Sequence, residues 1–238
     1  HRLIRRQRQM CIRDSFHITL KHHNSKNEEL YEKNKKLLQQ RQTEIKGAVL
    51  GKIELIRLMT RKITEDPLVI MPLLDVEQIG EASIDLRLGN SFIVLKRAKA
   101  RFLDISTKEK DDKVNAYEFQ EKIYLGIDDN LVLHPNEFIL GSTLEYICIP
   151  LDIMAYVIGK SSIGRLGLII ATATHIAPGY KGTPTLELSN IGNVPLILHP
   201  GELIAQIVLH RLATPLKEGY YGNYFGSTGP EFSKYLPS

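Results

Sequence analysis

The sequence predicts a mainly β protein, an antiparallel sandwich or barrel, with a few short helices and a helical N-terminal extension. Short runs rich in Ile, Val, Leu and Tyr follow one another between residues 121 and 212, and turn residues separate them. No helical segment of roughly 10–15 residues stands between these runs, as an α/β fold would require. The chain of 238 residues, 43% of them hydrophobic, is long enough to bury one core.

Composition excludes several classes of protein. No stretch approaches the roughly 20 apolar residues of a membrane span, so we expect a soluble protein that does not associate with a membrane. With Cys11 and Cys148 as the two cysteines, neither a disulfide scaffold nor a Cys-rich zinc site is expected, and a reducing, cytoplasmic location follows. Residues 1–47 hold 12 Lys/Arg against 5 Asp/Glu, whereas the remainder holds 19 against 22. Because the body is mildly acidic, polymeric nucleic acid is not an expected partner.

Residues 1–47 are predicted to be an extension of a domain that spans residues 48–238. Residues 1–15 lack any period, and the tract MCIRDS resembles translated adapter sequence, so we interpret them as an artefact. A basic binding arm is the alternative. Residues 25–46 are predicted to form a helix because apolar residues recur on one thin stripe among Glu, Lys and Gln: Leu30, Leu37, Leu38 and Ile45. Such a helix is either solvated with loose contacts or pairs with copies of itself.

The domain begins with a short helix and a first strand. The pattern predicts a helix over 53–62, followed by the extended tract 68–74. In residues 84–88 apolar Ile and Leu alternate with Asp85 and Arg87, which is the period of a half-buried strand.

The remaining strands follow a turn and a loop. Gly89-Asn90 predicts a turn before a strand at 92–95, and the charged stretch 108–115 predicts a surface loop. The later β runs lie at residues 121–126, 130–135, 137–150, 154–159, 166–174, 183–190, 194–200 and 202–212.

A Ser- and Gly-rich turn follows the strand at 154–159. Two hydroxyls and two cations lie within six residues, between Lys160 and Arg165. Gly159 and Gly164 would let backbone approach a ligand while the hydroxyls and Arg165 donate hydrogen bonds, which suits the capture of an oxyanion. The alternative is a turn with a purely structural role. The segment is not a Walker phosphate-binding loop, because the pattern GxxxxGK[ST] is missing from the sequence.

Glu187 is a carboxylate inside a β run. Because successive side chains alternate, Leu186 and Leu188 share one face and Thr185 and Glu187 the other. Spacing alone leaves two interpretations open, a solvent-facing Glu on a one-sided sheet or a carboxylate used in chemistry.

Five segments between residues 48 and 235 form a recognisable set: ASIDLRLGNSF (82–92), GKSSIGRLGL (159–168), PGYKG (178–182), TLELSN (185–190) and PGELIAQI (200–207). In these segments the chain resembles the dCTP deaminase family of the trimeric dUTPase-like superfamily. The resemblance implies a distorted β-barrel and a homotrimer whose active sites are shared between subunits.

The resemblance also implies roles for individual residues. Glu187 falls where the family keeps its general base, Ser161 and Arg165 stand beside it, and a flexible tail from about residue 216 closes over the triphosphate. The implied nucleotide-binding residues are Lys160, Ser161, Ser162, Ile163, Gly164, Arg165, Ala177, Thr185, Leu186, Glu187, Tyr220, Asn223 and Ser227.

The implied reaction is hydrolysis of dCTP to dUTP and ammonia, with dTTP as a further possible ligand. Mg²⁺ is expected on the nucleotide phosphates, held by water and phosphate. No zinc is expected, because the H-x-E…P-C-x-x-C signature of zinc deaminases is absent from the sequence.

Three residues depart from the family pattern. Ala177 replaces the Asp of Ile-Asp-Pro-Gly, and Asn223 and Ser227 replace the tail's Lys and Gln. The loop before Ala177 is expected to hold His175, either as a plain loop histidine or as a polar contact that replaces the missing Asp. These departures keep a second hypothesis open, a nucleotide-binding relative without catalysis that acts as a sensor or assembly protein. A dUTPase is a third, which Ala177 opposes because the Asp at this position activates water in dUTPases.

Overall fold

The structure is a computed structural model that describes residues 48–96, 119–126, 128–171 and 175–233. The expected artefact at 1–15, the helix at 25–46 and the loop at 108–115 lie outside the described residues. The described helices are α2 (Lys52–Met59), α3 (Ser161–Gly164) and the 3₁₀ turns η1 (Ile63–Glu65) and η2 (Val76–Gln78). The strands are β1 (Val69–Met71), β2 (Ile84–Arg87), β3 (Ser91–Leu95), β4 (Gln120–Tyr124), β5 (Leu131–Leu133), β6 (Phe138–Ser142), β7 (Tyr146–Cys148), β8 (Ile153–Gly159), β9 (Leu168–Ile170), β10 (His175–Ile176), β11 (Lys181–Gly182), β12 (Thr185–Asn190), β13 (Leu196–Leu198) and β14 (Leu203–Arg211).

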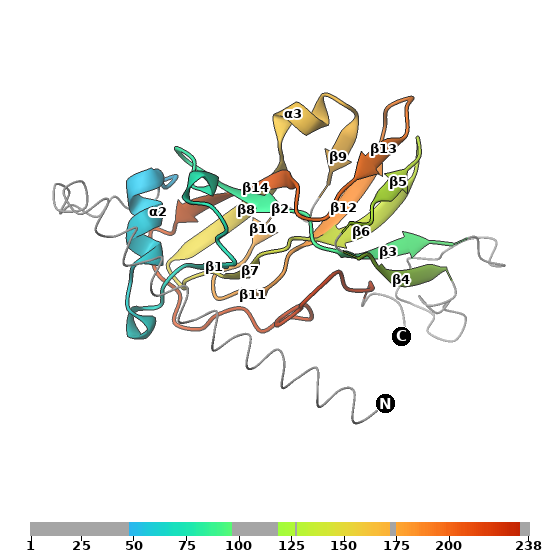
Figure 1. Cartoon of the computed structure of the whole chain (residues 1–238). Helices are drawn as coiled ribbons and strands as arrows, with labels where there is room; N and C mark the ends of the chain where they lie inside the picture. The colour runs from blue at the N-terminus through green and yellow to red at the C-terminus, as the bar shows by residue number, and fades with distance from the viewer. Residues whose placement is uncertain (1–47, 97–118, 127, 172–174, 234–238) are drawn as a thin grey trace, which may run out of the picture.

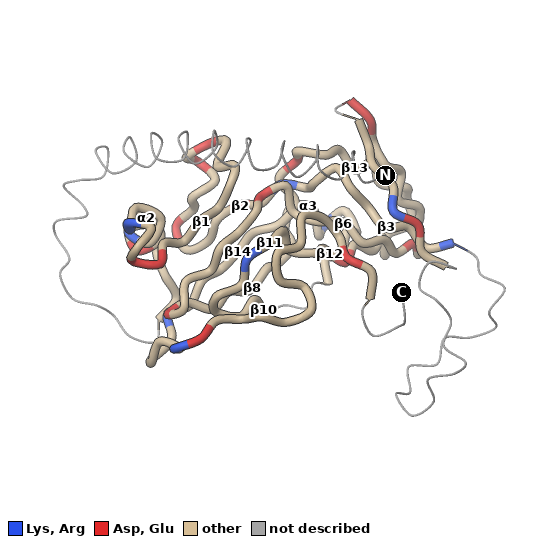
Figure 2. Tube along the Cα trace, turned by 90° about the horizontal axis from the view of Figure 1, so that it is seen from below, with Lys and Arg blue, Asp and Glu red and all other residues tan. Residues whose placement is uncertain are grey.

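The strands form two larger antiparallel sheets and two smaller ones. Their orders are β10-β8-β14-β2, β4-β3-β6-β12-β9, β1-β7-β11 and β13-β5. The body is elongated, with α2 at one end and β3 at the other (Figures 1 and 2). Among the described residues no helix is long and apolar enough to cross a membrane.

The mainly β fold is confirmed, but the described strands do not close into a barrel. The turn at Gly89 carries the chain from β2 in the four-stranded sheet to β3 in the five-stranded sheet. At that corner the sheets are joined by one isolated bridge, Leu88 to Thr143, and not by a continuous ladder. Each sheet therefore keeps its own edges, and the two pack around a common core.

The alternating strands divide core from surface as their period predicts. On β2, Ile84 and Leu86 are fully buried, whereas Asp85 and Arg87 between them are partly exposed. Helix α2 begins one residue earlier than predicted and ends at Met59, where Thr60 bonds back to the carbonyl of Ile56.

The register of the five-stranded sheet decides what lies on its outer face. Glu187 pairs with Leu140, Leu140 with Ile93, and Ile93 with Lys122. Side chains paired across strands point to the same face, so the face of Glu187 continues over β6 and β3 to β4. The opposite face, with Leu186, belongs to the core.

The C-terminal segment folds back beside β11 (Figure 1). The amides of Tyr220 and Gly226 donate to the carbonyls of Pro178 (2.9 Å) and Lys181 (2.7 Å), and that of Thr183 donates to Ser227 (2.8 Å). Gly179 adopts φ +78°, and a Cβ there would stand 2.5 Å from the backbone of Gly219. This close approach therefore requires glycine at position 179.

Candidate functional site

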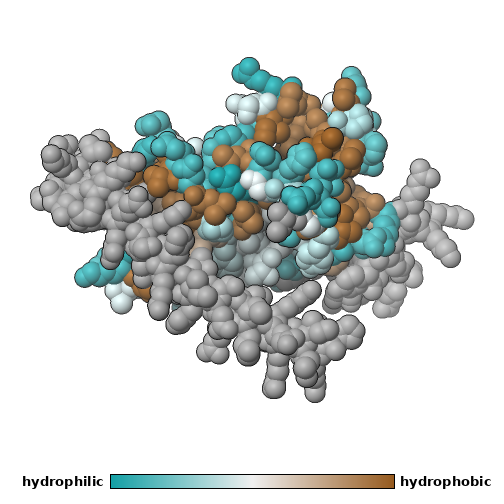
Figure 3. All heavy atoms as spheres, viewed as in Figure 1, coloured by the Kyte–Doolittle hydropathy of each residue, from teal (hydrophilic) through white to brown (hydrophobic). Residues whose placement is uncertain are grey.

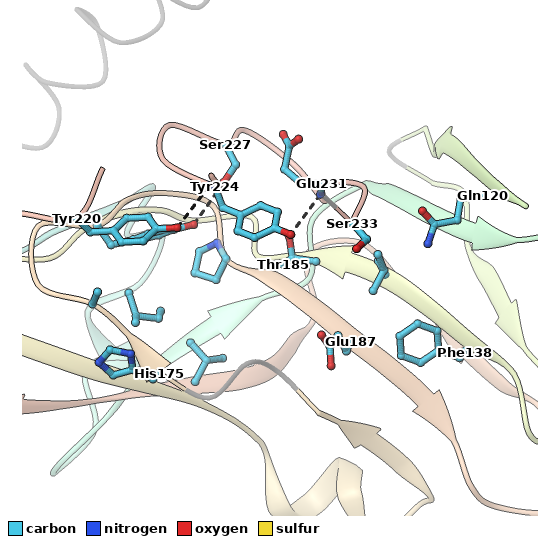
Figure 4. Close-up of a pocket in the computed structure, with 16 residues that line it drawn as sticks. Gln120, Phe138, His175, Thr185, Glu187, Tyr220, Tyr224, Ser227, Glu231 and Ser233 are labelled. Carbon is cyan, nitrogen blue, oxygen red and sulfur yellow. Dashed lines mark hydrogen bonds between the residues drawn. The ribbon is translucent and has the colours of Figure 1, made fainter. Parts of the chain in front are cut away.

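A cavity of about 530 Å³ lies on the outer face of the five-stranded sheet, beneath the C-terminal segment (Figure 4). Its volume is within the range of small-molecule sites, roughly 300–1,000 Å³. It is lined from β4, β6, β8, β10, β12, the loop around β11 and the tail by Gln120, Phe138, Leu140, Val157, His175, Ile176, Ala177, Tyr180, Pro184, Thr185, Glu187, Tyr220, Tyr224, Ser227, Glu231 and Ser233.

Glu187 lies in this cavity. Its side chain is half-buried, and among the described residues none forms a hydrogen bond or ion pair with its carboxylate. Burial raises the pKa of Glu187 above its usual value, because desolvation disfavours the charged form. The spacing left a solvent-facing Glu187 open, and in the structure the residue lines this cavity instead.

Thr185 lies on the same face of β12, two residues before Glu187, and its hydroxyl accepts a hydrogen bond from the amide of Glu231 at 3.4 Å. Leu186, between them, is fully buried in the core. Any contact of Leu186 with a ligand in this cavity would therefore be made by its backbone.

Aromatic side chains form the wall under the tail. The rings of Tyr180 and Tyr220 are 6.0 Å apart, and Tyr224 also lines the cavity. Burial raises the pKa of Tyr180 to about 12, so its hydroxyl stays protonated at neutral pH.

Ser227 connects the tail to this wall. It is buried, lies 3.3 Å from the hydroxyl of Tyr180 and donates to the carbonyl of Thr183 at 3.2 Å. Its hydroxyl is therefore engaged within the chain. Asn223, in contrast, is exposed and does not line the cavity.

His175 differs from its expected place. The expectation of a loop residue is wrong: His175 lies on the two-residue strand β10, opposite Tyr156 of β8, and lines the cavity beside Ala177. A strand of two residues is too short for its period to be visible in the sequence.

The Lys160–Arg165 segment lies away from this cavity. Its central residues form α3, on the side of the molecule opposite the tail, and none of them lines the cavity (Figure 1). Lys160 forms an ion pair with Asp85 of β2, whereas Ser161, Ser162 and Arg165 are exposed and Ile163 packs against the core. A Cβ on Gly164 would meet nothing within 4 Å, so its surroundings are open.

An exposed apolar surface lies beside α3. We call Leu166, Ile191, Val194 and Ile197 the β13 face; each is 58–69% exposed. The backbone links its parts, because the amide of Ile191 donates to the carbonyl of Gly167. Figure 3 shows apolar surface in this region, where Figure 1 places β13 and β5.

Comparison with known proteins places these observations in a family. The model of the family described as dCTP deaminase-like matches residues 53–212. A dCTP deaminase of Natronomonas pharaonis is 39% identical over 180 residues, which cover 73% of this chain and 90% of that protein. The chain belongs to the dCTP deaminase family.

Other members of the family show two further similarities. A protein of Dictyoglomus turgidum named dCTP deaminase, dUMP-forming, is 40% identical over 178 residues, 72% of this chain and 89% of that protein. The crystal structure of 2'-deoxycytidine 5'-triphosphate deaminase from Agrobacterium tumefaciens matches with a TM-score of 0.52 and 25% identity. That match covers 70% of this chain and about half (49%) of the other. The dUTPase-like β fold is thereby confirmed.

Part of the cavity wall of this dCTP deaminase family member could not be predicted from its sequence. Gln120, Phe138, Tyr180 and Glu231 were not singled out, although all four line it. A weak signal existed for Phe138, because it alternates with Leu140 on the strand that neighbours Glu187. Gln120, Tyr180 and Glu231 gave no such signal, because the residues beside them in the cavity wall lie far away in the sequence.

In the described ranges, no group of three or more His, Cys, Asp or Glu residues lies close enough to hold a metal ion. Among the described residues, the carboxylates that line the cavity are Glu187 and Glu231, and none of its lining residues is a Lys or Arg. The described part of the cavity therefore offers carboxylates and an aromatic wall, but no cation for a phosphate.

Proposed function

We propose that this chain is a dCTP deaminase, a hydrolase that converts dCTP and water to dUTP and ammonia. The observation that carries the proposal is Glu187, a half-buried carboxylate of raised pKa in a cavity large enough for a nucleotide. Membership of the dCTP deaminase family supports the choice of substrate.

Glu187 acts as the general base. It takes a proton from a water molecule as the water oxygen attacks C4 of the cytosine ring. It passes this proton to N3, then takes the second proton from the new hydroxyl on C4 and delivers it to the amino group. The C4–N bond then breaks, the C4 carbonyl forms and ammonia leaves. A raised pKa suits both transfers, because a carboxyl group whose pKa lies closer to neutral pH can both accept and donate a proton.

The site is completed by a second copy of the chain. A triphosphate needs cations, and in the part of the chain that the structure describes no Lys or Arg lines the cavity. Ser161 and Arg165 are exposed on α3, next to the β13 face, where another copy can cover apolar surface. We therefore infer a homotrimer in which Arg165 and Ser161 of one copy orient the Glu187 and the water of its neighbour. Arg165 cannot serve as the acid, since its own pKa is too high.

Mg²⁺ enters with the substrate on the phosphate oxygens and needs no ligand from the chain. Zinc is not part of the mechanism, because Glu187 activates the water directly. The nucleotide-binding residues implied by the resemblance remain part of the proposal, with dTTP as a further ligand of the same site.

The second candidate is the dUMP-forming reaction, which the names of the Dictyoglomus turgidum and Methanobrevibacter smithii relatives favour. Ala177 opposes it, because the methyl group that lines the cavity here cannot activate the water that would cleave the triphosphate. A binding protein without catalysis is the third candidate, favoured by Asn223 and by the internal hydrogen bonds of Ser227.

One assay separates the candidates. The full chain is incubated with dCTP, CTP or dCMP and Mg²⁺, and ammonia and pyrophosphate are followed separately. Ammonia alone supports the deaminase, and ammonia with pyrophosphate supports the dUMP-forming reaction. Nucleotide binding with neither product leaves the binding protein.

Glu187→Gln tests the base. It should abolish ammonia release and leave dCTP binding largely intact, because the amide keeps the shape but takes no proton. Ser189→Ala, on the same face of β12 and outside the cavity, is the control that should keep turnover. Because the base works deprotonated, wild-type kcat should fall as the pH falls through the raised pKa of Glu187. Normal turnover by Glu187→Gln would remove this carboxylate from the mechanism.

A further inference from the structure

Lys160 stands between β8 and α3, and its ammonium group is paired within the chain. Its Nζ donates to the carboxylate of Asp85 on β2, and the two side chains are 25% and 22% exposed. The carboxylate cancels most of the field of the ammonium group, so this pair adds little attraction for an anion. The Lys160–Arg165 segment therefore offers a phosphate the guanidinium of Arg165 and the serine hydroxyls rather than a free ammonium group.

The ion pair crosses a whole strand of the four-stranded sheet. In that sheet β14 lies between β8 and β2, and Asp85 pairs in register with Gln206 of β14. Two strand spacings, about 10 Å in all, separate the backbones of β8 and β2. The long side chain of Lys160 covers most of this distance. The pair thus ties the residue before α3 to a strand on the far side of β14.

Asp85 is held firmly by the core behind it. The side-chain amide of Gln78 donates to the carbonyl of Asp85 at 3.0 Å and to the carboxylate of Glu145 at 3.2 Å. The other oxygen of Glu145 accepts from the amide of Arg87 at 2.9 Å. Gln78 and Glu145 are buried, so this network fixes the backbone of β2 on both sides of the Asp85 side chain.

Lys160 in turn holds α3. Its amide donates to the carbonyl of Ile204 on β14 at 2.9 Å, and its own carbonyl accepts from the amides of Ile163 (3.1 Å) and Gly164 (2.9 Å). Ile163 packs against the core, whereas the serine and arginine side chains of the segment are exposed. The direction in which α3 points therefore depends on where Lys160 is held.

We propose that Asp85 is a positioning residue, which fixes the orientation of α3 by holding the ammonium group of Lys160. The inference rests on the proposed function, in which α3 of one copy orients the base and the water of its neighbour. It refines that function in one respect, because Lys160 acts through α3 and not by contact with the triphosphate. A small displacement of a positioning group slows the chemical step much more than it weakens binding, so kcat and KM separate the two roles.

Two substitutions test the pair. Asp85→Asn and Lys160→Met each remove one charge with little change of size, and each should lower kcat for ammonia release by about tenfold or more. The KM for dCTP should stay within about twofold. The double variant should lose no more than either single variant, because both remove the same interaction. Glu202→Gln, an exposed acid in the turn before β14, is the matched control and should keep both constants.

Conservative variants distinguish positioning from a general effect on folding. Asp85→Glu and Lys160→Arg keep both charges and should retain most of kcat, and every variant should keep the melting temperature and the mass of the assembly. A raised KM with unchanged kcat in Lys160→Met would assign Lys160 to the phosphates and overturn the proposal. Unchanged kcat in Asp85→Asn would overturn it too, as would a loss of kcat that follows a lower melting temperature and that neither conservative variant restores.

Hydrogen exchange of the free protein tests the same idea without turnover. Asp85→Asn should speed exchange several-fold in the peptide that covers residues 160–167, because the amides of Ile163 and Gly164 bond to the carbonyl of Lys160. Glu202→Gln should leave this exchange as in the wild type. Equal exchange in Asp85→Asn and the wild type would refute the proposal. A wild-type chain that releases no ammonia from dCTP would refute the deaminase alone, since exchange in α3 still reports on Asp85.

Discussion

Two positions of the cavity, Glu187 and Ala177, determine which carboxylates it contains. The alternation of β12 places Glu187 on the outer face of the sheet, and burial raises its pKa. Ala177 contributes a methyl group to the wall near His175. The cavity therefore holds the Glu187 carboxylate and lacks the one that the family pattern places at position 177.

Restoring that carboxylate gives a test at the same scale. Ala177→Asp should raise the preference for dCTP over CTP by about tenfold or more, because a charged acceptor can bind the 3′-hydroxyl of the sugar. We expect the sugar to adopt the position for this hydrogen bond only when it lacks a 2′-hydroxyl. Competition between dCTP and CTP in the ammonia assay measures the ratio. If the ratio stays the same, another residue recognises the sugar.

Among the elements, the tail and β11 form a unit that covers the cavity. Backbone hydrogen bonds run from Gly226 to Lys181 and from Thr183 to Ser227, and Gly179 admits the tail backbone at close range. The buried hydroxyl of Ser227 adds the side-chain contact. We infer that this segment opens to admit the nucleotide and closes by re-forming the same few bonds.

Ser227→Ala tests this role of the tail. Loss of the hydroxyl should weaken the closed position by about 1 kcal/mol and raise the KM for dCTP several-fold, with little change in melting temperature. Limited proteolysis should cut the tail of the variant faster than that of the wild type. Thr228→Ala removes an exposed hydroxyl one residue later and should behave as wild type. Equal KM values for both variants would contradict the role of Ser227.

For the whole molecule, the separation of α3 from the cavity is the decisive feature. Glu187 lies under the tail, while Ser161 and Arg165 lie on the opposite side of the chain. The exposed β13 face beside α3 provides apolar surface for a neighbour. We propose that the catalytic unit is a closed ring of three copies, in which each α3 would reach the cavity of the next copy.

Subunit mixing tests the shared site directly. Arg165→Ala and Glu187→Gln should each be inactive alone. When the two are unfolded together and refolded, a site that takes Glu187 from one copy and Arg165 from another is intact in about a quarter of random pairings. We therefore expect ammonia release at up to about a quarter of the wild-type rate, with a trimeric mass by sedimentation. A mixture that stays inactive while trimeric would place both residues in one chain.

The sequence by itself determined the elements and the family of this protein. Alternation placed Ile84 and Leu86 inside and Glu187 outside, because side-chain direction in a strand follows from local geometry. Tertiary structure alone decided that Gln120 and Phe138 share a face with Glu187, that Ser227 is tied to Tyr180, and that Lys160 pairs with Asp85. The residues in these pairs are 47 to 75 positions apart, and the register of paired strands that brings them together has no signature in any one segment.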